Sequence, residues 1–295
     1  MKPSTLQVRS FAKVNLALAV LGRRADGYHE IRTVYQSVDL HDMLIFRASS
    51  TLQLDCTGLK GVSTGDNLVW KAAHALARAS GPGRGAHITL RKNIPPGSGL
   101  GGGSSNAAAA LLGLRRFWNL EVSDQELWPL GGELGSDIPF FLRGGTALGI
   151  GRGEEIYPLP EPQPMNLVIV YPGVQISTAD AYKSLSLGLT SSQGVHKIQG
   201  FCSRLQSSSE WPAEIFNDFE VSILPAHPAI GEAKGFLNQS GATASLMSGS
   251  GSSVFGLFLD EESALAASRA VRRRAWRVFP AKTLSRTEYL HRMFG

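Results

Sequence analysis

A cluster of glycine and serine residues constrains this chain more than any other feature of its sequence. In GSGLGGG, residues 97–103, six of the seven residues are glycine or serine. Glycine loses more backbone freedom on folding than any other residue, so a folded domain keeps such a cluster where the backbone must turn sharply or approach another group closely. The segment GAHITLRKN before the cluster favours a strand. The segment SSNAAAALLGLRRFWN after it favours a helix capped by Ser104 or Ser105.

Known glycine-rich motifs narrow the possibilities for this loop. Its Gly-x-Gly-x-x-Gly spacing formally matches the dinucleotide fingerprint, but two prolines separate strand from loop, and no strand with an acidic end follows at the right distance. A Walker A loop is excluded because Gly-Lys-Ser/Thr does not occur. A flexible linker would gain nothing from lying between a strand and a capped helix. We therefore predict a loop that binds a polyphosphate through backbone N–H groups and the positive end of the helix dipole, with the hydroxyls of Ser104 and Ser105 bound to phosphate or Mg²⁺.

Composition and charge exclude several other classes of protein. The 295 residues are 43% hydrophobic and 18% charged, which is ordinary for a globular chain with room for two domains. Two widely separated cysteines, Cys56 and Cys202, exclude a disulfide scaffold and a Cys-rich zinc site. No apolar run reaches the roughly 18 residues of a membrane helix. The stretch VNLALAVLG is a poor signal peptide because Asn15 interrupts its apolar core. We expect a cytoplasmic protein that does not bind membranes.

The net charge of +5 permits an anionic ligand without requiring one. Much of the basic charge lies in DEESALAASRAVRRRAW, where acidic residues begin a predicted helix and Arg272–Arg274 end it, the polarity that a helix dipole favours. No ladder of aromatic residues accompanies these arginines, so a solvated helix end is favoured over a nucleic-acid surface.

The predicted elements mix strands and helices without strict alternation, which favours an α+β fold. We expect strands at residues 5–21 and 33–38, and a hairpin formed by DMLIFRAS and LQLDCTG. We expect a helix in DNLVWKAAHALARASG, capped by Asp66 or Asn67, a shorter one in SDQELWPLGGELG, and further strand in SDIPFFLRGGTALGIGRGEEIYPL. NLVIVYPG indicates a buried strand, residues 191–210 a variable polar surface, and ATASLMSGSGSSVFGLFLD two strands around a second Gly-Ser loop. The proline-rich residues 158–166 indicate a boundary between domains 1–160 and 161–295.

Five segments of the chain resemble the GHMP kinases. PPGSGLGGGSSNAA resembles their phosphate loop and MSGSGSSVFGLF their glycine-rich third motif. AKVNLALAVLGRRADGYHEIRTVYQSVDL, GSDIPFFLRGGTALGIGRGE and YPGVQISTADAY narrow the resemblance to the members that act on a cytidine-diphosphate-linked methylerythritol in non-mevalonate isoprenoid synthesis. The resemblance runs from about residue 10 to 260, and DGYHE is its most specific part. It implies a two-domain GHMP kinase fold, with an N-terminal domain of the ribosomal-protein type, a C-terminal α+β domain, and the active site in the cleft between them.

The resemblance also implies roles for individual residues. ATP, with Mg²⁺, would phosphorylate the 2-hydroxyl of the methylerythritol part of the substrate. Asp137 would be the base that takes the hydroxyl proton, and Lys13 the cation that keeps Asp137 charged. Asn15 points to the same face of a strand as Lys13 and can hydrogen-bond a substrate hydroxyl. Tyr28 and Tyr182 would sandwich the cytosine while His29 reads its edge.

Two sets of residues are expected to bind ATP. The first set comprises the phosphate loop and Asn67, which is expected near adenine: Pro95, Pro96, Gly97, Ser98, Gly99, Leu100, Gly101, Gly102, Gly103, Ser104, Ser105 and Asn67. The second set is the second Gly-Ser loop, which would close over the phosphates and comprises Ser248, Gly249, Ser250 and Gly251.

Simpler interpretations of these residues stay open on the sequence alone. Asp137 and Asn67 can be caps, Lys13 a surface lysine at a strand edge, and His29 an ordinary turn histidine. None of the seven histidines has metal-ligand spacing, so no protein metal site is expected. The alternatives in function are a homoserine or mevalonate kinase of the same family, or a nucleotide-binding protein without activity, which would not need Lys13 and Asp137. The oligomeric state, monomer or weak homodimer, is left open.

Overall fold

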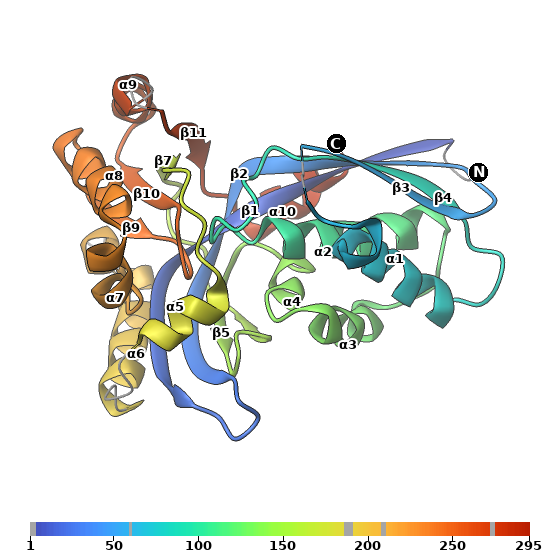
Figure 1. The fold of residues 1–295 in the computed structure, drawn as a ribbon, viewed down its shortest axis with the longest axis horizontal. Coiled ribbons are helices and arrows are strands. Elements are labelled where there is room, and N and C mark those ends of the chain that lie inside the picture. The colour runs from blue at the N-terminus through green and yellow to red at the C-terminus, as the bar shows by residue number, and fades with distance from the viewer. Residues whose placement is uncertain (1–3, 59–60, 186–190, 208–210, 272–274) are drawn as a thin grey trace.

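Two β-sheets and their covering helices form the framework of the protein (Figure 1). The computed structural model describes residues 4–58, 61–185, 191–207, 211–271 and 275–295. The first sheet has the order β3-β4-β2-β1-β8, with β5 pairing to β2 and β6 to β5. Its strands are β1 (Thr5–Arg23), β2 (His29–Arg47), β3 (Leu52–Thr57), β4 (Ala86–Arg91), β5 (Thr146–Ile150), β6 (Glu155–Pro158) and β8 (Phe216–Asn217). The second sheet, of order β11-β7-β10-β9, is antiparallel and comprises β7 (Asn166–Tyr171), β9 (Ala244–Met247), β10 (Val254–Phe258) and β11 (Arg277–Lys282).

The helices cover the two sheets separately. In Figure 1, α1 to α4 lie beside the first sheet, and α7 to α9 lie beside the second. The helices of the first half are α1 (Leu68–Ala79), α2 (Gly102–Phe117), α3 (Asp124–Leu134) and α4 (Ile138–Phe141), with a 3₁₀ turn η1 (Thr64–Asp66). Those of the second half are α5 (Thr178–Ser184), α6 (Ser191–Ser207), α7 (Glu220–Ala226), α8 (Pro228–Gln239), α9 (Glu261–Val271) and α10 (Arg286–Met293), with a 3₁₀ turn η2 (Trp211–Glu214). The expected α+β class is confirmed.

Strands β1 and β2 form one long hairpin of 19 residues per strand that connects the two halves. Three register shifts interrupt their pairing, at Phe11/Ala12, Asn15/Ala17 and Val20/Gly22. Such bulges bend a strand and increase its twist. In Figure 1 the two blue strands accordingly curve from the side of α1–α4 towards the side of α5 and α6. The middle of β1 therefore lies where the two halves of the protein meet.

Three hydrophobic clusters make up the core. The first packs α1, α2 and α4 against the first sheet, through residues such as Phe46, Leu111 and Phe140. The second lies between the two sheets and α6, and the third packs α7, α8 and α9 against the second sheet. Strand β1 contributes side chains to all three clusters, so its alternation of faces links the two halves.

The predicted hairpin between DMLIFRAS and LQLDCTG is wrong. Residues 43–47 of β2 pair antiparallel with β4, while β3 pairs in parallel with the other edge of β4. The segment after β3 contains α1, which packs on this part of the sheet and returns the chain for a parallel pairing. A crossover through a helix is the usual way to join parallel strands, and a local hairpin signal does not reveal it.

Two further predictions of local structure are wrong. The residues Ile138–Phe141 form the short helix α4 and not a strand, with Pro139 in its first turn and all four residues buried. The polar region 191–210 contains the helix α6, in which Ile198, Phe201 and Leu205 are buried in the second cluster. Three buried apolar positions, with the partly buried Val195 and Cys202, carry this packing within a long polar run, and the polar composition hid their helical spacing.

Helix α10 belongs with the first cluster although it lies in the second half of the chain. Leu284, Tyr289 and Met293 are buried there, and the Tyr289 hydroxyl donates to the carbonyl of Phe141 at 2.6 Å.

The predicted division into domains at residues 160 and 161 stays a prediction. Arg272–Arg274 lie outside the described residues. Within the described part of the chain, no helix has the length and apolar character needed to cross a membrane.

Candidate functional site

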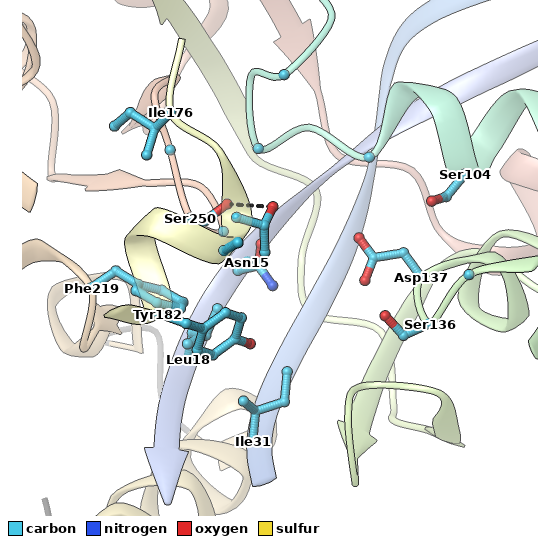
Figure 2. A pocket seen from close by; sticks show the side chains of 18 of the residues that line it. Asn15, Leu18, Ile31, Ser104, Ser136, Asp137, Ile176, Tyr182, Phe219 and Ser250 are labelled. Carbon is cyan, nitrogen blue, oxygen red and sulfur yellow. Dashed lines mark hydrogen bonds between the residues drawn. The ribbon is translucent and has the colours of Figure 1, made fainter. Parts of the chain in front are cut away.

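A cavity of about 1060 Å³ lies where the two halves meet. Its walls come from both Gly-Ser loops, the middle of the β1–β2 hairpin, the residues before α4, and α5. Figure 2 shows Ser104 and Asp137 on one side of this space and Tyr182, Leu18 and Ile31 on another. The cavity thus has a polar end beside the glycine loop and an aromatic and aliphatic end beside α5.

The first Gly-Ser loop has the backbone that its glycines suggest. Gly97, Gly99 and Gly101 have φ of 61°, 78° and 68°, in the left-handed region that disfavours other residues. A Cβ on Gly99 would lie 2.0 Å from the carbonyl oxygen of Ser248, and one on Gly101 would lie 2.7 Å from the ring of Phe141. Gly99 and Gly101 are therefore required both by backbone conformation and by close packing, and Gly97 by backbone conformation alone.

Helix α2 begins at Gly102, and its N-cap is Gly101, without any side-chain cap. Gly101 to Ser104 line the cavity, so the first N–H groups of the helix, which have no intrahelical partners, lie beside it. The prediction of a serine cap at Ser104 or Ser105 is wrong. A side-chain cap would occupy one of these N–H groups, whereas a glycine cap leaves them available to an anion.

Two residues predicted in the loop have their groups engaged elsewhere. The Ser105 hydroxyl donates to the carbonyl of Phe11 at 2.6 Å, and its N–H donates to Gly101 at 2.8 Å. The prediction that this hydroxyl binds phosphate or Mg²⁺ is therefore corrected. The Leu100 side chain is fully buried, and its carbonyl accepts a hydrogen bond from the N–H of Lys13. These two residues anchor the loop to β1.

A buried ion pair, Asp42–Lys92, holds the residues that lead into the first Gly-Ser loop. Asp42 is 1% exposed and pairs with the Lys92 ammonium, while its other oxygen accepts from the backbone N–H of Asn93 and Ile94 just before the loop. Asn106 in α2 accepts from Lys92 and donates to Asp42, at 2.9 Å each. The pair thus joins the entry of the loop to the helix that follows it.

The second Gly-Ser loop packs directly on the first. The Ser248 hydroxyl donates to the carbonyl of Gly99 at 3.0 Å, and the Ser253 N–H donates to that of Ser98 at 3.0 Å. Ser248 is fully buried, whereas Gly249, Ser250 and Gly251 line the cavity. This second loop therefore forms a wall of the phosphate end as well as a turn between β9 and β10.

Asn217, which the sequence did not single out, holds this second loop in place. Its amide donates to the carbonyls of Met247 and Gly249, at 2.8 and 2.7 Å, and its oxygen accepts from the N–H of Phe219. It lies in β8, a strand of only two residues that pairs with β1. No sequence signal marks so short a strand.

Lys13 and Asp137, predicted as a pair, are brought together in the cavity. The Lys13 ammonium lies 3.7 Å from Oδ2 of Asp137, and the two side chains are 4% and 29% exposed. Lys13 also donates to Oδ1 of Asn15 at 2.6 Å. Burial lowers the pKa of Lys13, and the nearby charge of Asp137 opposes this effect. Asp137 is at the N-cap position of α4, but its side chain makes no capping bond, so its carboxylate remains in the cavity.

Asn67 is the N-cap of α1, with its side-chain oxygen accepting from the N–H of Val69 at 2.9 Å. Its neighbour Leu68 lines the cavity next to the phosphate loop. The capping role is thus present in the structure, and a contribution of Asn67 to an adenine site stays a prediction.

Aromatic side chains meet at the other end of the cavity. The rings of His29 and Tyr182 stack with centroids 4.4 Å apart and planes 14° apart, and Phe219 meets Tyr182 edge-on at 4.9 Å. Tyr28 is 57% exposed and lies against the guanidinium of Arg152, at 4.9 Å. The ring that stacks on Tyr182 in this structure is therefore His29, and the sandwich between Tyr28 and Tyr182 stays a prediction.

The protonation of these side chains follows from their burial. Burial, and secondarily Arg23, lowers the pKa of His29, so its imidazole is neutral near pH 7 and keeps one acceptor nitrogen. Burial, and secondarily Asp137, raises the pKa of Tyr182, so its phenol keeps its proton. A neutral acceptor and flat rings are the groups that can recognise a neutral base.

Comparison with known proteins identifies similar sequences and folds. The model of the GHMP kinases N terminal domain matches residues 67–145, and that of the GHMP kinases C terminal matches residues 205–277. A 4-diphosphocytidyl-2-C-methyl-D-erythritol kinase of Pelobacter propionicus is 41% identical over 283 residues, covering 95% of this chain and 99% of that protein. A crystal structure of a 4-(cytidine 5'-diphospho)-2C-methyl-D-erythritol kinase matches with a TM-score of 0.80 and 34% identity, over 94% of this chain and 99% of the other. A homoserine kinase from Cytophaga hutchinsonii shares the fold, with a TM-score of 0.74 and 20% identity over 97% and 96% of the two chains.

Proposed function

Because the chain belongs to the 4-diphosphocytidyl-2-C-methyl-D-erythritol kinases within the GHMP kinases, we propose that it phosphorylates the 2-hydroxyl of that diphosphocytidyl alcohol with ATP. The reaction is a step of the non-mevalonate route to isoprenoid precursors, and we place it in the cytoplasm, where ATP is available. The observation that carries this proposal is the Lys13–Asp137 pair, held in one cavity beside a glycine loop and an exposed helix N-terminus.

The chemistry required of the residues is positioning and charge stabilisation. The alcohol oxygen attacks the terminal phosphorus of ATP, its proton passes to Asp137, and ADP leaves with the electrons of the broken bond. Lys13, buried beside Asp137, keeps the carboxylate charged and offsets negative charge on the moving phosphoryl group. Oδ1 of Asn15 accepts a hydrogen bond from the Lys13 ammonium at 2.6 Å, which fixes the position of this positive charge.

The nucleotide phosphates are assigned to the first N–H groups of α2 and to the two Gly-Ser loops. These elements supply backbone donors without acidic side chains, as an anion site requires. Mg²⁺ would bring charge neutralisation to these phosphates. Among the described residues, no group of three or more His, Cys, Asp or Glu is arranged to hold a metal. The cavity does offer the hydroxyl of Ser104, and an oxygen ligand of this kind suits Mg²⁺ when phosphates complete its coordination.

The base of the substrate is assigned to the aromatic end. Tyr182 and Tyr28 offer ring faces and His29 a neutral acceptor, which together match a flat base bearing an amino donor. A homoserine or mevalonate substrate has no group that would use these rings. The aromatic end therefore supports the diphosphocytidyl alcohol over those alternatives.

A comparison of substrates tests the proposal. ADP release should be fast with the diphosphocytidyl alcohol and at least 100-fold slower, in kcat/KM, with homoserine or mevalonate, since an unfilled base site loses several kcal/mol of binding. Mass spectrometry of the product should show one added phosphoryl group. Equal rates with homoserine would assign the chain to that activity, and ATP binding without any ADP release would indicate a non-catalytic nucleotide-binding protein.

A further inference from the structure

Tyr35 is a buried tyrosine whose ring is fixed beside the catalytic pair. It lies in β2, is 1% exposed, and packs against Phe140 with ring centroids 4.9 Å apart. A Cβ on Gly149 would lie 2.6 Å from Cε2 of this ring, and one on Gly153 would lie 2.4 Å from its hydroxyl oxygen. Gly149 and Gly153 are thus required by the ring. Close packing therefore holds the tyrosine side chain in place.

The Tyr35 hydroxyl has a single role as a donor. It donates to Oδ1 of Asp137 at 3.0 Å, and the carbonyl of Gly153 lies 3.4 Å away as a weaker partner. Burial, followed by the charge of Asp137, raises the pKa of Tyr35 well above its ordinary value, so the phenol stays protonated at any pH at which a kinase is assayed. Tyr35 therefore offers a hydrogen and cannot accept the substrate proton.

The two oxygens of Asp137 consequently differ. Oδ1 is occupied by the phenol, whereas Oδ2 faces the Lys13 ammonium at 3.7 Å, too far for a direct hydrogen bond. Asn15 restrains that ammonium from the other side and is itself held by a hydrogen bond to Thr33 at 2.8 Å. An alcohol oxygen between the two groups can accept from Lys13 and donate its proton to Oδ2.

We propose that Tyr35 is a positioning residue for phosphoryl transfer, which orients Asp137 so that Oδ2 is the oxygen that receives the substrate proton. The proposal rests on the proposed function for its substrate, an alcohol bound between Lys13 and Asp137. It assigns a purpose to the tyrosine of VYQSVDL and to Gly149 and Gly153, which the mechanism above does not use.

The pH dependence of turnover reports this role. The titratable or charged groups that face Tyr35 and Asp137 are Lys13 from β1, Tyr182 from α5 and Glu154 from the turn between β5 and β6. Removing the phenol hydroxyl takes a donor from the charged carboxylate and leaves the other groups in place. The ascending limb of the kcat–pH profile should then move to higher pH.

Tyr35→Phe tests the proposal because it keeps the ring and removes only the hydroxyl. We expect kcat to fall roughly 10-fold, with the ascending limb shifted to higher pH and the KM for ATP unchanged. In an Asp137→Asn background the same substitution should have almost no effect, because the group through which it acts is absent.

Tyr289→Phe is the matched control. It too removes the hydroxyl of a fully buried tyrosine, but that hydroxyl donates to the backbone carbonyl of Phe141 and not to a carboxylate. It should lower thermal stability without moving the pH profile. Unchanged kcat and pH profile in folded Tyr35→Phe, or an equal loss in the Asp137→Asn background, would overturn the proposal. The parent's preference among alcohols tests the proposed function separately.

Discussion

Replacing Asp137 with asparagine separates catalysis from binding. The amide keeps the shape of the side chain but cannot take the proton of an alcohol. General base catalysis contributes about 10²–10⁴ in rate, so kcat should fall by that factor. ATP and substrate should still bind with nearly unchanged affinity, because the loop donors and the aromatic end are untouched. Steady-state kinetics with calorimetric binding of both ligands measures these two effects independently.

The same substitution also leaves Lys13 without its counter-charge. Two unit charges 3.7 Å apart attract by about 4.5 kcal/mol at an effective dielectric constant of about 20. Because Asp137 is 29% exposed, and because the amide is cheaper to bury than the carboxylate, we expect a net loss of about 1–2 kcal/mol in unfolding free energy. The double variant with Lys13→Met should lose less than the sum of the single losses.

The pH dependence of that loss has a definite sign. The pKa of Lys13 is already lowered in the folded protein by burial, and it should be lowered further without Asp137. Between the folded pKa and the ordinary value of 10.5 the unfolded chain binds more protons, so the stability of the variant rises with pH in that window. The deficit in unfolding free energy relative to the parent should therefore shrink at alkaline pH.

Turnover of Asp137→Asn within a few-fold of the parent would refute the base assignment. The proton would then leave by another route, for example directly to phosphate.

Three other substitutions probe the remaining parts of the site. Gly103→Val should raise the KM for ATP at least 10-fold, because the new side chain lies beside the free N–H groups of α2. The fold should be retained, since a Cβ at Gly103 meets only Leu68, at 3.6 Å. Gly231→Val, in an open helical position, is the control. Tyr182→Ala should weaken substrate binding by about 1–3 kcal/mol while Tyr182→Phe is nearly silent, and equal damage by both would show in calorimetry that the hydroxyl and not the ring is needed. Asn217→Asp removes two hydrogen-bond donors from the second Gly-Ser loop, so thermal unfolding should show a loss of about 2–3 kcal/mol and kinetics a raised KM for ATP; an unchanged KM would mean that this loop does not touch the nucleotide.

Residues that act through local backbone could be predicted from the sequence. The glycine loop, the helix after it and the Asn67 cap follow from short-range chemistry, and the resemblance brought Lys13 and Asp137 together correctly. Tyr35 and Asn217 could not be found in this way. The partner of Tyr35 is Asp137, 102 residues later in the chain, and the partner of Asn217 is Gly249, 32 residues later. Neither residue lies in a sequence pattern that distinguishes it from an ordinary core residue.

The same limit explains the errors in the fold. The pairing of β3 with β4 depends on a helix that crosses between them, and no local signal distinguishes this from a hairpin. Helix α6 is decided by three buried apolar side chains within a polar sequence. In both cases the tertiary contacts override the local pattern.

The packing of α10 has a consequence for how the protein is made. The Phe11 ring lies 5.5 Å from that of Tyr289, and the Arg9 guanidinium donates to the carbonyl of Arg292, so the first strand of the chain is completed by its last helix. A ribosome releases β1 long before α10 exists, so the exposed edge of this cluster must wait until about 270 further residues have been made. We therefore expect nascent chains that stop before residue 284 to bind chaperones through β1, and to be cleaved by proteases that spare the chain once α10 has packed.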